Sequence, residues 1–539
     1  MTERSGRRPR GVATVIILSA LALIAGRIMD VGIDGRTPFL SANDRSRWAH
    51  VAAMVDTGTH RIDHLVEVVD PVHRNRRPWN TIDKVAHRDG DGVMRQYSSK
   101  PPLMAFGVAG VYRVLRDVTG VRLTKRPGKV ARWTLLAINL PLVAILFWGT
   151  WFAMRSDDWS PFTTAVMAAA IGFGTLLTPM ASSLNNHLVA AACVAAAAAL
   201  IRFRFFLGSN NLRQMVPLND RKRRAVNFGI GGSVALTAAH ELPALSIAVG
   251  TVVLMIWADR RCLLPMLFGI GIVTVASFAA TYAVHGSFRP PYAHRSDGEL
   301  LAEIVDDDAP PISHLKAAKS DGNLRSRLGH KIADELGAAG KVGWIASGDS
   351  ERLHLVVGSD DFAVRRSERG WSVRRWDDWY DYPGSHWRGT VRRGVDAGEP
   401  DRGRYAFHTL IGHHGVFSLT PMWWLMPIGL AMTAVQRPIF GEVNRWLGLI
   451  AVATITCWLF YVWRPPIDRN YGGVSCGLRW LFWFAPLWFV AMRPAIDVLN
   501  RSRSGQIALG LLVALSIASA ATALDNPWDH PWLYQISRR

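Results

Sequence analysis

Cysteine is scarce in this sequence, with four residues in a chain of 539. Cys193, Cys262 and Cys457 lie in or beside apolar segments, and Cys476 lies in a polar loop without an obvious partner. Their positions show neither a disulfide framework nor the spacing of a zinc site. We therefore expect no disulfide scaffold, no metal site and no cofactor.

Acidic residues are also few, at 42 Asp and Glu against 62 Lys and Arg, which gives a formal net charge of +20. Such an excess could indicate nucleic-acid binding. However, many of the basic residues flank apolar segments, where they set membrane topology. We expect no nucleic-acid partner, and favour membrane lipids and phosphate-bearing substrates instead.

Apolar segments recur along the chain, which is 49% hydrophobic and contains 22 Trp. Each has roughly 15 to 23 residues, close to the length that spans a hydrocarbon core of about 30 Å. We expect an all-α polytopic membrane protein with about eleven transmembrane helices and an extracytoplasmic subdomain that is α+β or irregular. The expected spans are 12–29, 133–153, 161–180, 188–207, 226–241, 243–258, 262–284, 412–434, 446–463, 480–492 and 506–524.

The distribution of basic residues predicts the orientation. Four Arg precede the first apolar run, which has no small-residue cleavage site, so we expect an uncleaved anchor with its N-terminus in the cytoplasm. The basic cluster at 221–224 then falls in a cytoplasmic loop of an inner-membrane protein. Counting 101–118 as a span would move this cluster outside, so we expect that segment to be a helix on the outer surface.

Two long polar regions are left outside the membrane by this topology, at 31–132 and 285–405. We therefore divide the chain into an N-terminal transmembrane module at 1–284, which includes the first outer loop. An extracytoplasmic subdomain follows at 285–405, and a C-terminal transmembrane module at 406–539. The aromatic and charged stretch at 371–387 is more typical of a subdomain core than of a sugar-binding surface.

The first outer loop places a carboxylate and two cations close to the first span. Asp44 is followed by Arg47, and Lys100 precedes a double proline. A carboxylate can take a proton from an acceptor, and Arg or Lys can hold phosphate oxygens. The alternative is a helix-capping Asp with ordinary surface cations, which composition alone favours.

These residues resemble the first outer loop of GT-C membrane glycosyltransferases, most of all aminoarabinose (lipid A) transferases and protein O-mannosyltransferases. Asp44 falls on the catalytic Asp of that family, Arg47 on its Arg and Trp48 on its Tyr. Residues 54–59 match its ML-x-x-G-D stretch, and 100–103 match its K-P-P-L segment. The resemblance implies that Asp44 activates the acceptor and that Lys100 contacts the lipid phosphate.

Some positions depart from the family pattern. Arg45 replaces a Glu, and Ser99 replaces the Glu before the Lys. A second family carboxylate lies in a T-D-x-P segment, whereas the comparable stretch 182–187 contains no acid. Near the C-terminus, 470–480 resembles a GG-x-S-x-G-x-R segment of some bacterial members.

Further polar residues are predicted at the outer ends of later spans, as a binding site requires. We select them as substrate-binding candidates: Asn186, His187, Glu241, His413, His414, Tyr471 and Arg479. Each has a structural alternative. Glu241 could satisfy backbone freed by a proline, the histidines could pack at helix ends, and Arg479 could extend to the membrane interface.

The sequence thus favours an inverting transfer of sugar from a polyprenyl-phosphate donor to a lipid, glycan or protein acceptor at the outer face. A lipid-linked glycan flippase is less favoured, because it would need midplane polar groups and repeat symmetry. A non-catalytic membrane scaffold stays open, because the second acid is missing.

Overall fold

In this computed structural model, the described residues are 7–30, 39–69, 77–205, 218–317, 322–388, 392–436 and 442–537. They form two compact units. Unit 1 comprises Met1–Asp44, Gly107–Ser277 and Gly394–Arg539, and unit 2 comprises Arg45–Phe106 and Phe278–Arg393. Residues 1–6 and 31–38, on which the N-terminal and first-loop predictions partly rest, lie outside the described residues.

Long apolar helices make up most of unit 1. The helices that coincide with the predicted spans are α1 (Arg7–Asp30), α5 (Pro127–Met154), α6 (Pro161–Phe173), α8 (Asn186–Phe205), α9 (Asp220–His240), α10 (Leu245–Ala258), α11 (Leu263–His285), α16 (Leu425–Gln436), α17 (Glu442–Trp463), α18 (Ala485–Leu499) and α19 (Arg503–Ala521). Seven helices of the described chain, including short 3₁₀ extensions, are long and apolar enough to cross a membrane. The chain is therefore a multi-pass integral membrane protein, and its count of about eleven spans stays a prediction.

Three further apolar helices are shorter, at Pro161–Phe173, Leu242–Ala258 and Pro421–Val435. The first of these ends earlier than its predicted span because the chain leaves the helix after Phe173 and makes the separate turn α7 (Leu177–Met180). The segment at 101–118 forms α4 (Pro102–Thr119), which is not among the seven long apolar helices.

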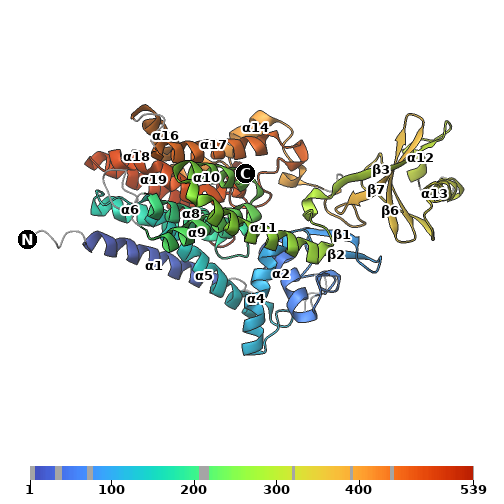
Figure 1. Cartoon of the computed structure of the whole chain (residues 1–539), viewed down its shortest axis with the longest axis horizontal. Helices are drawn as coiled ribbons and strands as arrows, with labels where there is room; N and C mark the ends of the chain where they lie inside the picture. Colours follow the sequence, from blue (N-terminus) through green and yellow to red (C-terminus); the bar gives the residue numbers. More distant parts are fainter. Residues whose placement is uncertain are drawn as a thin grey trace, which may run out of the picture. The chain divides into compact units, whose positions relative to one another are not determined.

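Close helix packing in unit 1 depends on small residues. Figure 1 shows a set of helices whose axes are roughly parallel: α1, α6, α8, α9, α18 and α19. α8 packs on α5, where a Cβ at Gly149 would lie 3.1 Å from the backbone of Ala195. A Cβ at Gly231 of α9 would lie 2.3 Å from the carbonyl oxygen of Met266 in α11, so only glycine allows this approach.

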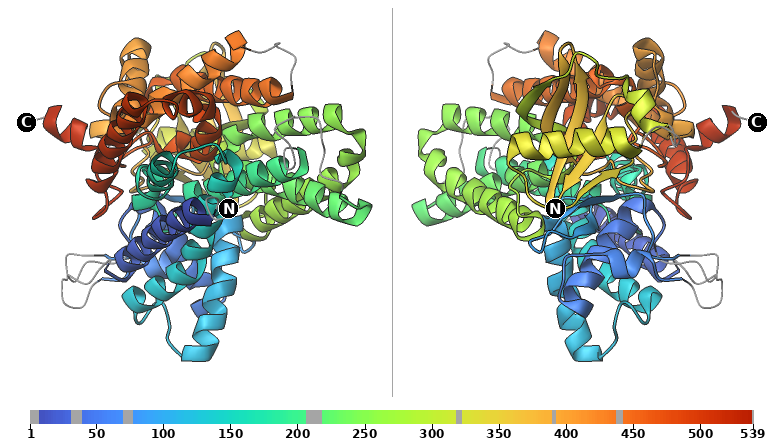
Figure 2. Two further views of the ribbon diagram at one scale, coloured as in Figure 1. Left: turned by 90° about the vertical axis from the view of Figure 1, so that its left-hand side faces the viewer. Right: turned by 90° about the vertical axis from the view of Figure 1, so that its right-hand side faces the viewer.

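Unit 2 contains two antiparallel sheets. The first is the hairpin of β1 (Lys84–Arg88) and β2 (Met94–Ser98). The second has the strand order β3-β7-β6-β5-β4, built from β3 (Arg295–Val305), β4 (Val342–Ile345), β5 (Leu353–Val357), β6 (Asp360–Ser367) and β7 (Gly370–Asp378). Helix α13 (Gly322–Leu336) lies across one face of this sheet (Figure 2).

The larger sheet and α13 share one buried core. The inward side chains of the strands and of α13 form one core, which includes Leu328, Ile332, Leu355, Val364 and Trp371. This agrees with the core interpretation of the 371–387 stretch. The predicted α+β subdomain is present in these residues.

Segments from both polar regions of the sequence combine in unit 2. Trp379 packs with Val85 and Tyr97 of the hairpin, and its carbonyl accepts a hydrogen bond from Ala86 N at 2.9 Å. The indole of Trp387 donates to the carbonyl of Ile82 at 2.7 Å. The domain boundaries predicted at 284/285 and 405/406 stay a prediction. The two compact units divide the chain differently, because they place residues 45–106 together with 278–393.

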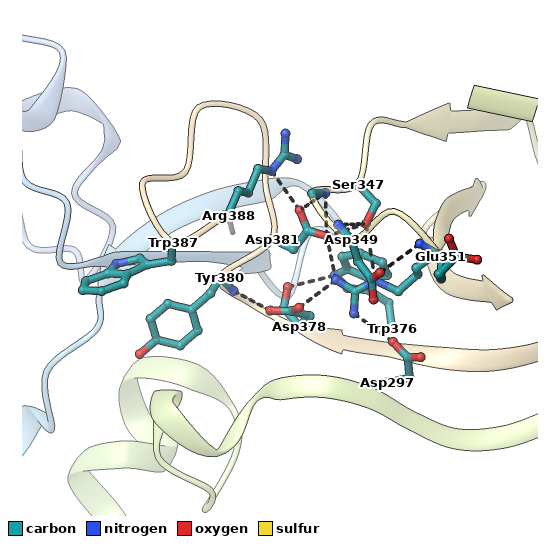
Figure 3. A network of polar contacts seen from close by, with 12 residues as sticks. Asp297, Ser347, Asp349, Glu351, Trp376, Asp378, Tyr380, Asp381, Trp387 and Arg388 are labelled. Atoms are coloured by element: carbon teal, nitrogen blue, oxygen red, sulfur yellow. Dashed lines mark hydrogen bonds and ion pairs between the residues drawn. The ribbon is translucent and has the colours of Figure 1, made fainter. Parts of the chain in front are cut away.

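A buried ionic network holds the loops at the end of the larger sheet. The guanidinium of Arg352 donates to Asp297 at 2.8 Å, to Asp378 at 2.7 Å and to Asp381 at 2.6 Å. Asp381 also accepts bonds from Ser347, Gly348 and Arg388 (Figure 3). Each charge is therefore compensated by hydrogen-bonded partners.

Candidate functional site

Asp44 lies at the start of α2 (Ala42–Ala52) and is fully buried. Its Oδ1 accepts hydrogen bonds from Ser41 N at 2.9 Å and Ser41 Oγ at 3.2 Å, and its Oδ2 accepts one from Leu40 N at 3.0 Å. Asp44 N in turn donates to Ser41 Oγ at 3.1 Å. This reciprocal pattern is a capping box with Asp in place of Glu. The structure therefore gives Asp44 the capping role that was the alternative to catalysis, and the catalytic role stays a prediction.

The two cations predicted beside it belong to unit 2. Lys100 forms an ion pair with Asp83, with Nζ and Oδ2 2.9 Å apart, and Arg47 is buried. Asp83 also accepts a hydrogen bond from Ser46 Oγ through its backbone carbonyl at 2.6 Å. The sequence analysis missed Asp83, because nothing in the linear spacing from Asp83 to Lys100 indicates that the two meet.

Three of the predicted substrate-binding residues, Asn186, His187 and Glu241, are in direct contact. Glu241 caps the C-terminus of α9, and the other two residues open α8. Asn186 Nδ2 donates to Glu241 Oε1 at 2.6 Å and to His240 O at 3.0 Å. The Nδ1 of His187 lies directly against the same carboxylate oxygen. A buried carboxylate is thus compensated by an amide and an imidazole.

His413, His414 and Tyr471 also meet. The Nδ1 atoms of the two histidines are 2.5 Å apart, and His414 stacks on Tyr471 with ring centroids 5.0 Å apart. Tyr534, which the sequence analysis did not select, lies against both histidines with centroids at 5.0 and 5.4 Å. The structure therefore joins a loop after α14 (Arg402–Leu410), the glycine loop at 470–479 and the C-terminal helix α20 (Trp532–Ser537).

Burial changes the proton affinity of these aromatic groups. The pKa of Tyr471 is raised by desolvation and by the negative charge of Glu399, whose Oε2 accepts the phenol hydrogen bond at 3.3 Å. The pKa of His408, which stacks on His413 at 3.8 Å, is lowered by desolvation and by Arg404. Both shifts favour the neutral forms near pH 7.

Arg479 lies against the glycine loop. Tyr471, Gly472 and Gly473 all have positive φ, at 57°, 90° and 74°. A Cβ on Gly472 would lie 3.1 Å from Arg479 Cγ, so glycine lets the backbone approach the Arg side chain. The guanidinium carbon of Arg479 lies 4.8 Å from the ring centroid of Trp528. The arginine is therefore held by an aromatic face and a backbone turn.

A mostly apolar pocket lies beside these groups. It encloses about 370 Å³ of space not occupied by atoms, part of which is open to solvent. His414 is a polar lining residue, and Phe482 forms part of the wall. The ring of Phe482 also contacts His187 at a centroid distance of 6.5 Å. The pocket thus has His414 in its wall, and His187, which contacts Glu241, touches the wall residue Phe482 from outside the lining.

One apolar cluster of unit 1 contains Trp528, the aromatic residue that Arg479 contacts. Trp528 packs with Leu176, Cys476 and Leu40, the residue that donates to Asp44. The indole of Trp528 donates to Ser183 Oγ at 3.0 Å, three residues before Asn186. Trp528 was missed because a single Trp near a chain end carries no motif, and only its contacts mark it.

A metal site is not formed among the described residues, where no group of three or more His, Cys, Asp or Glu could hold an ion.

Comparison with known proteins gives no family assignment. No protein-family model and no curated protein matches the chain. Two crystal structures of the Archaeoglobus fulgidus oligosaccharyltransferase are similar to it. One, tethered to an acceptor peptide containing the NVT sequon through a disulfide bond, has a TM-score of 0.43 at 12% identity, and the apo form has 0.40 at 14%.

The chain spans about half the length of these neighbours, covering 55% and 56% of them, while 95% of the chain itself is matched. These TM-scores are too low for the likeness to decide fold or function.

Proposed function

We propose that this chain is a membrane glycosyltransferase of the GT-C class that uses a polyprenyl-phosphate-linked sugar. The observation that supports the proposal most is the meeting of distant segments in unit 1. His414 lines one largely apolar pocket, Arg479 follows its lining residue Leu478, and His187, which contacts Glu241, lies against its wall residue Phe482. An apolar pocket with a few converging polar groups is what a ligand that is part lipid and part phosphate requires.

In the proposed reaction the acceptor loses a proton and its oxygen or nitrogen attacks the anomeric carbon. The bond between that carbon and the phosphate oxygen breaks, and the lipid phosphate leaves with inversion at the carbon. Arg479 would neutralise the phosphate, since its guanidinium carries a permanent charge. Arg47 and Lys100 remain predicted phosphate ligands, and Asp44 the predicted base.

We place this reaction at the extracytoplasmic face of the inner membrane, with the N-terminus in the cytoplasm. The supporting argument is the distribution of basic residues in short loops. The acceptor would be a lipid, glycan or protein.

The test is release of free polyprenyl phosphate from a panel of polyprenyl-phosphate sugars by the purified full chain. Sugar-dependent release supports the proposal, and the absence of release with every donor contradicts it. Asp44→Asn and Ser41→Ala then separate catalysis from capping, because both weaken the capping box but only the first removes the carboxylate. Loss of activity in Asp44→Asn alone supports a base, whereas equal losses show a structural role.

The capping geometry of Asp44 favours one other candidate, a non-catalytic membrane scaffold. Both carboxylate oxygens of Asp44 already accept hydrogen bonds from Ser41 and Leu40, which is the arrangement of a structural capping residue. Tight binding of a polyprenyl-phosphate sugar without turnover would support the scaffold.

A further inference from the structure

Trp528 is the aromatic residue against which Arg479 lies. The guanidinium carbon of Arg479 is 4.8 Å from the centroid of the indole, within the range of a cation–π contact. Stacking uses the flat face of a guanidinium, whereas phosphate oxygens bind the N–H groups along its edge. A stacked Arg can therefore receive a phosphate without losing its aromatic contact.

Trp528 is itself fixed on several sides. It is buried and packs in one apolar cluster with Cys476 of the glycine loop. Its indole N–H donates to Ser183 Oγ at 3.0 Å, and its backbone N–H donates to Asn526 Oδ1 at 3.1 Å. Because packing and two hydrogen bonds hold the ring, it offers Arg479 a face of fixed orientation.

The segment around Trp528 is also tied to the glycine loop that carries Arg479. Cys476 N donates to the carbonyl of Pro527 at 2.9 Å, which joins the two segments through their backbones. Within the glycine loop, a Cβ on Gly472 would lie 3.1 Å from Arg479 Cγ. The stem of Arg479 thus lies beside a turn of its own loop, while its guanidinium lies beside a ring contributed by the C-terminal segment.

We propose that Trp528 is a positioning residue, which holds Arg479 in the orientation that binds the phosphate of a polyprenyl-phosphate ligand. The inference rests on the proposed function, because that proposal assigns the phosphate to Arg479. An unrestrained Arg side chain adopts many rotamers and loses this freedom when it binds a ligand. An Arg that is already ordered in the free protein loses less freedom, and therefore binds the same phosphate more tightly.

The experiment measures binding of farnesyl phosphate, a short polyprenyl phosphate, to the detergent-solubilised full chain. Farnesol, which has the same apolar chain without the phosphate, is the matched ligand. Trp528→Leu removes the aromatic face, and Trp528→Phe keeps a ring but loses the hydrogen bond to Ser183. The matched control is Trp532→Leu, because Trp532 packs against the same apolar cluster but donates its indole N–H to Ser519 Oγ, at 2.9 Å.

Trp528→Leu is expected to bind farnesyl phosphate about tenfold more weakly, while its affinity for farnesol stays close to that of the wild type. Trp528→Phe should recover most of the loss, and Trp532→Leu should bind both ligands like the wild type. An unchanged affinity for farnesyl phosphate in Trp528→Leu, or no recovery in Trp528→Phe, overturns the proposal. Equal losses for the two ligands, or an equal loss in Trp532→Leu, overturn it in favour of a packing role.

A second readout needs no ligand. Phenylglyoxal modifies guanidinium groups, and mass spectrometry of the peptide that contains Arg479 gives the rate of its modification. This rate should rise in Trp528→Leu and stay at the wild-type value in Trp532→Leu, whereas an unchanged rate in Trp528→Leu overturns the positioning role. If the wild type does not bind farnesyl phosphate but the difference in rate is present, the proposed function fails and the role of Trp528 in holding Arg479 is retained.

Discussion

The carboxylate of Glu241 at the end of α9 lies in direct, buried contact with the imidazole of His187 at the start of α8. Asn186 donates to the same carboxylate oxygen at 2.6 Å. The two helices are joined at this end by contacts to one carboxylate that is only 6% exposed. Burying such a pair costs desolvation energy. Removing one partner alone is therefore more destabilising than replacing both partners, because the remaining group is left buried without compensation.

Glu241→Ala is therefore expected to lower the free energy of unfolding by about 3–5 kcal/mol, because it removes the carboxylate partner of the buried His187 and one of the two acceptors of Asn186. Glu241→Gln keeps an oxygen acceptor and should cost less. Thermal unfolding of the detergent-solubilised chain measures both variants. Equal midpoints for Glu241→Ala and wild type would contradict the structural role.

Gly472→Ala is expected to weaken binding of polyprenyl phosphate about tenfold. The left-handed φ of 90° strains any other residue by about 1–3 kcal/mol, and the new Cβ pushes on Arg479 Cγ, 3.1 Å away. Equilibrium binding of polyprenyl phosphate by the full chain measures the effect.

The matched control is Gly448→Ala in α17, where a Cβ would meet no atom within 4 Å. It should leave binding unchanged and slightly stabilise the helix, since alanine favours helix over glycine. If both variants bind like wild type, Arg479 does not contact the phosphate.

Arg352→Met is expected to destabilise unit 2 by about 3–5 kcal/mol, because three carboxylates lose the cation that compensates them. The control is Arg375→Met, whose ion pair with Glu299 has side chains 63% and 64% exposed. That pair should contribute less than about 1 kcal/mol. Protection from hydrogen exchange in β5 and β6 measures both, and similar losses in the two variants would contradict the prediction.

Acid is expected to destabilise the β1–β2 hairpin through His87. Burial against Tyr97 and Trp379, together with the charge of His294, lowers the pKa of His87 to about 4. The unfolded chain has a pKa near 6.5, so between pH 6.5 and 4 the unfolded state binds more protons. The free energy of unfolding should therefore fall as the pH is lowered through this window, by up to about 3 kcal/mol.

Hydrogen exchange of β1 and β2, corrected for the intrinsic rates at each pH, measures this dependence. His87→Gln removes the titrating group and should flatten the profile between pH 6.5 and 4. A profile of the same slope in this variant would assign the effect to other groups.

The sequence by itself determined the membrane class and the positions of the helices. Apolar segments of about 20 residues can satisfy their backbone hydrogen bonds within a bilayer only as helices, so α1, α5, α8, α11 and α17 follow from local composition. The sequence also selected Asn186, His187 and Glu241 as polar groups at helix ends, where a charge in an apolar context needs partners.

Only the tertiary structure decided which partners these groups have. Asp44 is held by Ser41 and Leu40, Lys100 by Asp83, and Arg479 by Trp528 and the glycine loop. A side-chain contact depends on the crossing of helices and the return of loops, whose geometry is set by packing rather than by spacing along the chain. For that reason the residue types of the site could be predicted from the sequence, but their pairing could not.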